Sequence, residues 1–136
     1  MSAKAQIVVT ETQSLSFGTF SFTNFNSVLS ISIENGGGFT TNGNVAVITP
    51  PSRGEFSLTG GPPNSAYTIT TPASFTISGP GGNFTVDDIR IRPVTLSTDP
   101  SGADDYSIAA RIRSLGGGTV YNNGTYNNTF DITIAF

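Results

Sequence analysis

Turn-forming residues interrupt this chain of 136 residues too often for long helices: it holds 16 glycines and 8 prolines. The runs between them are rich in threonine, valine, isoleucine and phenylalanine, which suit a pleated, half-buried surface. Within the runs, apolar and polar residues alternate with the period of two that marks a strand, and no segment shows the period of an amphipathic helix. The pattern predicts an all-β protein.

Short runs with this pattern follow one another along the whole chain, each bounded by turn residues. We expect strands at residues 7–12, 28–33, 45–48, 54–59, 66–71, 75–77, 84–92, 106–113 and 129–136. Such spacing is typical of a sandwich or barrel, and helical patterns that would indicate parallel βαβ units are missing. We therefore predict one antiparallel β-sandwich domain over residues 14–136, preceded by an N-terminal arm of residues 1–13.

Composition excludes several classes of function. Only 11% of the residues are charged, and nine acids against six bases give a net charge of −3, which argues against nucleic-acid binding. The chain contains no basic amphipathic stretch of the kind that attaches a protein to a membrane surface. Cysteine, histidine and tryptophan are absent, so the chain has no disulfide, thiolate nucleophile, imidazole base or His/Cys metal site. We expect no catalysis, no metal and no cofactor.

The first five residues carry neither an apolar signal core nor a membrane span. Ala3, Lys4 and Ala5 have the small-x-small pattern of a signal-peptidase site. We interpret residues 1–5 as the remnant of a secretion signal or as the edge of a cloned segment.

Both ends of the chain are strongly β-forming. In the first run, one face of the expected strand carries Ala5, Ile7 and Val9. In the last run, one face carries Phe130, Ile132, Ile134 and Phe136. An open edge this apolar is an aggregation site, so we expect the terminal strand to be central or fully covered.

Four segments, taken in order, resemble a bacterial secreted family of unknown function that is similar to spore-coat-U-like and archaic chaperone–usher pilin domains. They are residues 15–20 (LSFGTF), 66–74 (AYTITTPAS), 84–88 (FTVDD) and 124–136 (GTYNNTFDITIAF). Pilin subunits also place a glycine ahead of an aromatic residue at the C-terminus, as Gly124 and Phe136 are placed here.

This resemblance implies an immunoglobulin-like sandwich and assembly by donor-strand exchange, in which the arm of one subunit completes the sheet of its neighbour. The donor strand would be residues 5–13. A periplasmic chaperone and an usher are the further partners that it implies, and its relatives lie at the bacterial cell surface.

Four groups of side chains could carry chemistry, and each has a structural alternative. Neighbouring Asp87 and Asp88 point to opposite faces of a strand, so we expect ion pairing rather than an acid/base pair. Asp99, Asp104 and Asp105 could bind calcium or simply stabilise a turn. The remaining two groups are a possible anion-binding stripe of Arg90, Arg92, Arg111 and Arg113, and a possible sugar platform of Tyr121 and Tyr126.

Two functions remain open. The first is a structural subunit of a bacterial extracellular filament, pilus or coat, built from copies of itself by strand complementation. The second is a monomeric secreted module that binds glycan or another surface ligand through its loops.

Overall fold

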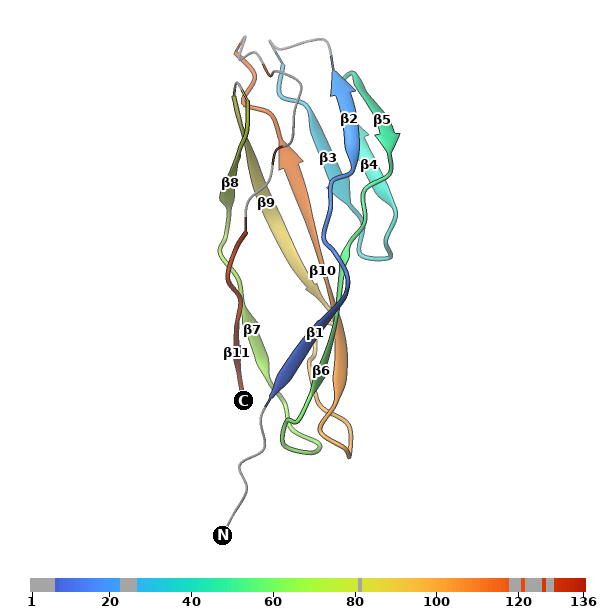
Figure 1. Ribbon diagram of the computed structural model, residues 1–136, viewed down its shortest axis with the longest axis vertical. Helices are drawn as coiled ribbons and strands as arrows, with labels where there is room; N and C mark the ends of the chain where they lie inside the picture. The colour runs from blue at the N-terminus through green and yellow to red at the C-terminus, as the bar shows by residue number, and fades with distance from the viewer. Residues whose placement is uncertain (1–6, 23–26, 81, 118–120, 122–125, 127–128) are drawn as a thin grey trace.

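The computed structural model describes residues 7–22, 27–80, 82–117, 121, 126 and 129–136, and it is elongated (Figure 1). These residues form strands and turns and no helix, so the all-β prediction is confirmed. The strands are β1 (Val8–Gln13), β2 (Thr19–Phe22), β3 (Ser30–Ile33), β4 (Phe39–Asn42), β5 (Val45–Thr49), β6 (Gly54–Thr59), β7 (Thr68–Thr70), β8 (Phe75–Ser78), β9 (Asn83–Arg92), β10 (Asp104–Arg113) and β11 (Thr133–Ala135). No helix within the described ranges could span a membrane.

One large sheet of seven strands forms the body of the molecule. Its main path runs β1-β6-β10-β3-β4, while β9 pairs with the other edge of β10 and β8 pairs with β9. The long strand β10 lies at the centre, because its first half pairs with β6 and its last residues pair with β3. Two separate pairs, β2–β5 and β7–β11, complete the fold, and all pairings are antiparallel.

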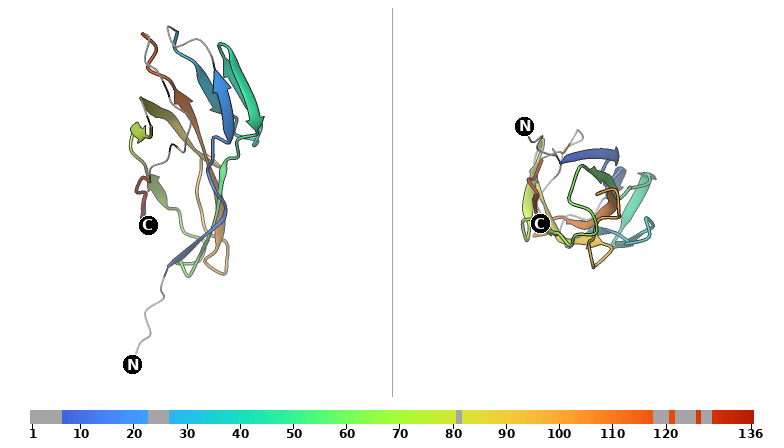
Figure 2. Two further views of the ribbon diagram at one scale, coloured as in Figure 1. Left: turned by 45° about the horizontal axis from the view of Figure 1, so that its top comes forward. Right: turned by 90° about the horizontal axis from the view of Figure 1, so that it is seen from below.

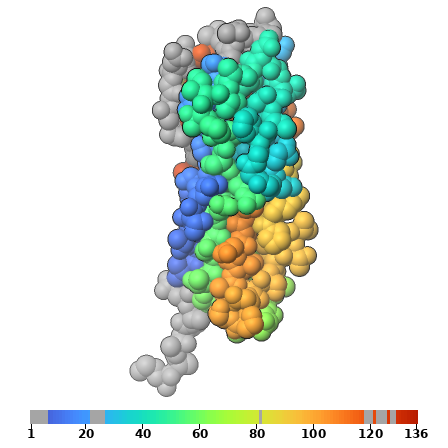
Figure 3. Space-filling model, turned by 90° about the vertical axis from the view of Figure 1, so that its right-hand side faces the viewer, coloured from blue at the N-terminus to red at the C-terminus, as the bar shows by residue number. Residues whose placement is uncertain are grey.

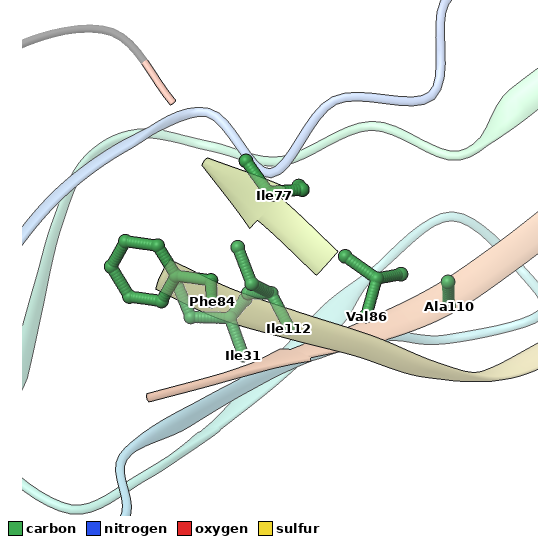
Figure 4. Packing of buried hydrophobic residues seen from close by; sticks show 6 residues of the cluster. All are labelled: Ile31, Ile77, Phe84, Val86, Ala110 and Ile112. Carbon is green, nitrogen blue, oxygen red and sulfur yellow. The ribbon is translucent and has the colours of Figure 1, made fainter. Parts of the chain in front are cut away.

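The strands curl around two hydrophobic clusters, so the sandwich-like fold class is confirmed (Figure 2). The first cluster packs under β2 and β5 and contains Ile31, Ile77, Phe84, Val86, Ala110 and Ile112 (Figure 4). The second cluster lies toward the end where β7 and β11 run and contains Leu58, Tyr67, Leu96, Tyr106 and Ile108. Half-buried Leu15 and Ile89 pack against both clusters and join them.

Glycines 36–38 lie in the turn between β3 and β4. The Glu34 N–H donates to the Gly38 carbonyl at 2.7 Å, and Gly37 has a φ of 100°, which suits a residue without a Cβ. This hairpin creates β4, a strand that the sequence pattern does not predict.

Candidate functional site

The first strand, β1, is an edge strand whose outer side has no partner strand in the described part of the chain. All six of its residues are exposed. It is held by backbone pairing to β6, by a hydrogen bond from Thr12 Oγ1 to the Glu55 carbonyl (3.1 Å), and by one from Gln13 Nε2 to the Arg53 carbonyl (2.8 Å). β1 is therefore attached along a single edge and buries little of its own surface.

The predicted donor residues lie on the core side of β1. Val9 lies opposite Leu58, which is fully buried, and Ile7 shares the face of Val9 because strand side chains alternate. Even so, Ile7 and Val9 are 42% and 40% exposed. Ala5 lies outside the described residues. Within one chain β1 completes its own sheet, while pairing between copies stays a prediction.

The expectation that the C-terminal strand is central or fully covered is wrong. β11 spans only three residues and pairs with β7 alone among the described strands. Phe130, Ile132 and Ile134 do alternate as expected and are half-buried against the second cluster. Phe136, however, is 46% exposed, with its ring 5.4 Å from that of Tyr67. Only three residues of β7 pair with β11, so side-chain packing rather than a central ladder holds this segment. Gly124 lies outside the described residues.

β1 and β11 have opposite directions along the long axis. The chain enters β1 from the lower end of Figure 1, and β11 leads to the C-terminus near that same end. Seen from below, they lie on different sides of the curl (Figure 2, right). The lower end of the molecule therefore carries two strand edges without a partner strand in the described chain, together with the exposed side chains of Ile7 and Phe136.

The tyrosines predicted as possible ligand-binding residues contribute to packing. The rings of Tyr121 and Tyr126 lie 4.3 Å and 5.0 Å from that of Phe84, between ring centroids. The Tyr121 hydroxyl donates to the Asn83 carbonyl and accepts from the Leu115 N–H, and the Tyr126 hydroxyl donates to the Pro80 carbonyl. Both side chains are half-buried, which favours the packing role over a sugar platform.

Of the predicted arginine stripe, Arg111 and Arg113 meet at one carboxylate and are partly neutralised by it. Arg111 holds Asp87 with two hydrogen bonds of 2.9 Å and 3.1 Å, and Arg113 approaches the same carboxylate to 2.6 Å. The bond from Arg111 is the main reason why the pKa of Asp87 lies below its usual value. Arg90 lies 3.4 Å from Asp88.

Arg90 also donates to the Asn35 side chain and to the Ile33 carbonyl, so it braces the β3–β4 turn. Arg92 donates to the carbonyl of Ile91. The two adjacent aspartates belong to different ion pairs and do not form an acid/base pair.

The carboxylates considered for calcium each bind groups of the protein. Asp99 Oδ1 accepts from the N–H of Ala103 and from the N–H and hydroxyl of Ser101, and these bonds lower its pKa. Asp104 accepts from Tyr67, and Asp105 accepts from Ser57. Across the described ranges, no group of three or more carboxylates is placed to hold a metal ion.

Two tyrosines of the second cluster differ in how their hydroxyls are satisfied. Tyr67 donates to Asp104 at 2.7 Å, and burial together with this bond raises the pKa of Tyr67 well above its usual value. Tyr106 is almost fully buried and stacks on Phe56 at 5.2 Å, but its hydroxyl has no partner in the described structure.

The edge strand β4 is the element of functional interest that sequence reasoning misses. Its residues Phe39, Thr40, Thr41 and Asn42 are all exposed, so no buried face imposes an alternation of apolar and polar residues. The available signal is indirect: a glycine-rich turn directly after a well-marked strand implies a returning partner strand.

Residues 7–136 match the family described as a domain of unknown function, DUF4402. No curated protein and no solved structure matches the chain.

Proposed function

The chain belongs to the DUF4402 family, and we propose that it is a structural subunit of a bacterial extracellular filament, pilus or surface coat, assembled by β-strand complementation between copies. The observation that carries the proposal is the state of β1. Its core-facing residues Ile7 and Val9 remain about 40% exposed although they lie beside the buried Leu58. A strand of this kind gains buried surface when a second chain covers it.

The size of that gain is modest for each residue. Full burial of an isoleucine or valine side chain stabilises by about 1.5–3 kcal/mol, so covering the remaining exposed part of Ile7 and Val9 is worth about 1 kcal/mol each. Backbone hydrogen bonds along the new edge add about 0.5–1.5 kcal/mol each. Summed over the six residues of β1, these side-chain and hydrogen-bond contributions favour association, and the extent of assembly then depends on protein concentration.

The acceptor in this proposal is an edge that the fold leaves unpaired in the described chain. β11 presents one, and its neighbouring residues Phe130, Ile132 and Ile134 lie over the second cluster. If β1 leaves its own chain, β6 presents another, with Leu58 behind it. The donor is residues 5–13 of a second copy, and the contacts resemble those that β1 makes within one chain.

Further support comes from the chemistry that the chain lacks. Its aspartates at 87, 99, 104 and 105 are bound to protein groups, and its composition offers no thiolate nucleophile or imidazole base. The resemblance to pilin domains supports secretion to the cell surface and, as partners before assembly, a periplasmic chaperone and an usher. The alternative of a glycan-binding module gains no support from Tyr121 and Tyr126, whose hydroxyls bind the chain's own backbone.

The test compares the full chain with a chain that starts at Ser14. Sedimentation over a concentration series should show polymers for the full chain and none for the shortened one. A synthetic peptide of residues 5–13 should then bind the shortened chain and raise its melting temperature. A full chain that stays monomeric at every concentration would refute the proposal.

A matched pair of variants separates assembly from folding. Ile7→Asp with Val9→Asp charges the core-facing side of β1, whereas Val8→Asp charges the side that faces Thr59. Val8 is 48% exposed, so the control position is as open as the test positions. The double variant should lose assembly, while Val8→Asp should retain it; equal loss in both would show that the core-facing side has no special role.

A further inference from the structure

β4 presents a second, independent edge at the opposite end of the main sheet path from β1. The Glu34 N–H donates to the Gly38 carbonyl at 2.7 Å, so these residues form a hydrogen-bonded pair of the β3–β4 ladder. Hydrogen-bonded and non-hydrogen-bonded pairs alternate along an antiparallel ladder. The backbone groups of Thr40 therefore point to β3, and those of Phe39 and Thr41 point outward.

Apart from its short length of four residues, this edge lacks the features that protect edge strands from pairing with another chain. The four residues Phe39–Asn42 include no charge and no proline, and their pairing with β3 runs without a bulge. β1, in contrast, carries Glu11 and a register shift after it. β8 pairs with β9 along one edge, and its Phe75 stacks on Phe130 at 4.9 Å between ring centroids. In Figure 3 the turquoise segment of β4 lies on the surface of the side that faces the viewer.

The sequence of β4 is complementary to itself when two copies run antiparallel. Let Thr40 lie opposite Thr40 of the second copy. Phe39 of each copy is then opposite Thr41 of the other, and each of these two pairs exchanges two N–H···O=C bonds, which gives four backbone hydrogen bonds. The central pair is then non-hydrogen-bonded, where side chains are closest, and paired threonines are favourable across strands. Glu34 accepts from the Thr40 hydroxyl at 3.2 Å and follows β3, so in each copy the strand β4 lies between Glu34 and the second copy.

We infer that β4 is a lateral interface at which two copies of this chain join their main sheets edge to edge, with Thr40 on the two-fold axis. The contact is isologous, so each copy uses it once. It uses a different edge strand from β1 and does not depend on strand exchange. In a filament or coat it joins neighbouring subunits side by side.

Cysteine trapping tests the register directly, because the chain has no cysteine of its own. In Thr40→Cys the two cysteines are about 4.5 Å apart between Cα atoms, within the range of a disulfide. In Asn42→Cys, on the same exposed face, the offset of four residues separates the cysteines by about 13 Å. Under a mild oxidant, Thr40→Cys should give at least tenfold more covalent dimer than Asn42→Cys. Absence of that dimer, or equal trapping of both variants, would overturn the interface.

Proline substitution tests the outward hydrogen bonds. Thr41→Pro removes an N–H that points away from β3 and leaves the β3–β4 ladder intact, whereas Thr41→Val keeps the N–H. Thr41→Pro should weaken the lateral dimer at least tenfold in sedimentation with a melting temperature close to that of Thr41→Val. A lateral dimer as strong in Thr41→Pro as in Thr41→Val would refute the register. Trapping at position 40 reports only on β4, so its result stands whether or not β1 is exchanged.

Discussion

Val9 on β1 lies directly opposite Leu58 on β6, yet Leu58 is fully buried while Val9 keeps 40% of its surface exposed. The difference arises because Leu58 belongs to an inner strand, which has β10 on its other side, and Val9 belongs to the edge. The two residues of this cross-strand pair therefore differ: Leu58 contributes to the core, whereas Val9 keeps a surface that a second chain would cover in the proposed assembly.

This difference predicts unequal costs for removing the two side chains. Leu58→Ala should destabilise the monomer by about 2–5 kcal/mol, because it leaves a cavity in a closed cluster. Val9→Ala should cost less than about 1 kcal/mol, since the site is open to solvent and leaves no cavity. Urea unfolding at a concentration where the protein is monomeric measures both values. Equal costs would mean that β1 is as deeply integrated as β6.

The charge cluster on the outer face of the sheet predicts a pH-dependent contribution to stability. Asp87→Asn leaves Arg111 and Arg113 without their shared carboxylate and should destabilise by about 1–3 kcal/mol at pH 7. Asp88→Asn is the control: its ion pair is exposed and worth at most about 1 kcal/mol, and asparagine also tolerates the positive φ of 50° at that position.

The sign of the pH effect follows from the pKa of Asp87, which is lowered in the folded state. Such a carboxylate stabilises the fold above its unfolded pKa of about 3.9 and loses that effect as the pH falls through the lower folded pKa. The difference in unfolding free energy between wild type and Asp87→Asn should stay constant from about pH 7 to 5 and disappear below about pH 4. Denaturant unfolding at a series of pH values measures it, and a gap that persists unchanged in acid would contradict this origin.

The turn around Asp99 predicts indifference to calcium. Its carboxylate already accepts from Ser101 and Ala103, so a cation would have to displace bonds that define the turn. Addition of EDTA or of calcium should leave the melting temperature unchanged. A fall of many degrees with EDTA that calcium reverses would assign a metal site to this turn.

Most strands with a buried face could be predicted from the sequence, whereas β4, which has none, could not. β2 is also missed, although its Phe20 packs against the first cluster. Residues 54–59 alternate because Gly54 and Leu58 face inward, and the predicted and observed bounds of β6 agree. β4 has four exposed residues and β1 has six, but the valines of β1 still mark it as a strand. β4 carries no such mark, so the strand on which the lateral interface depends was missed.

Tertiary pairing also determined features that no local pattern shows. One of Asp87 and Asp88 was expected to pair with Arg90 or Arg92, and Asp88 does pair with Arg90. The register of β9 against β10 places Asp87 opposite Arg111 instead. The register shift between Ala109 and Arg111, with the positive φ of Asp88, separates Asp87 from the arginines on its own strand. The exposure of Phe136 likewise follows from the short pairing of β11 with β7, which the apolar alternation of residues 130–136 does not reveal.

The second cluster offers the sharpest comparison of two buried hydroxyls. Tyr106→Phe removes a hydroxyl without a partner in the described structure, so it should leave the stability unchanged or raise it by up to about 1 kcal/mol. Tyr67→Phe breaks the bond to Asp104 and should cost about 1–2 kcal/mol.

Alkaline pH acts on both tyrosines, because burial raises the pKa of Tyr106 as well as that of Tyr67. The raised pKa of Tyr67 means that the folded protein keeps a proton that the unfolded chain loses above its usual pKa of about 10. Its contribution is present below that value and is lost as the pH rises toward the folded pKa. Wild-type protein should therefore lose stability above about pH 10, and Tyr67→Phe should lose less. Chemical unfolding between pH 8 and about 11 measures the two slopes, and identical slopes would show that Tyr67 is ionised as readily in the fold as outside it.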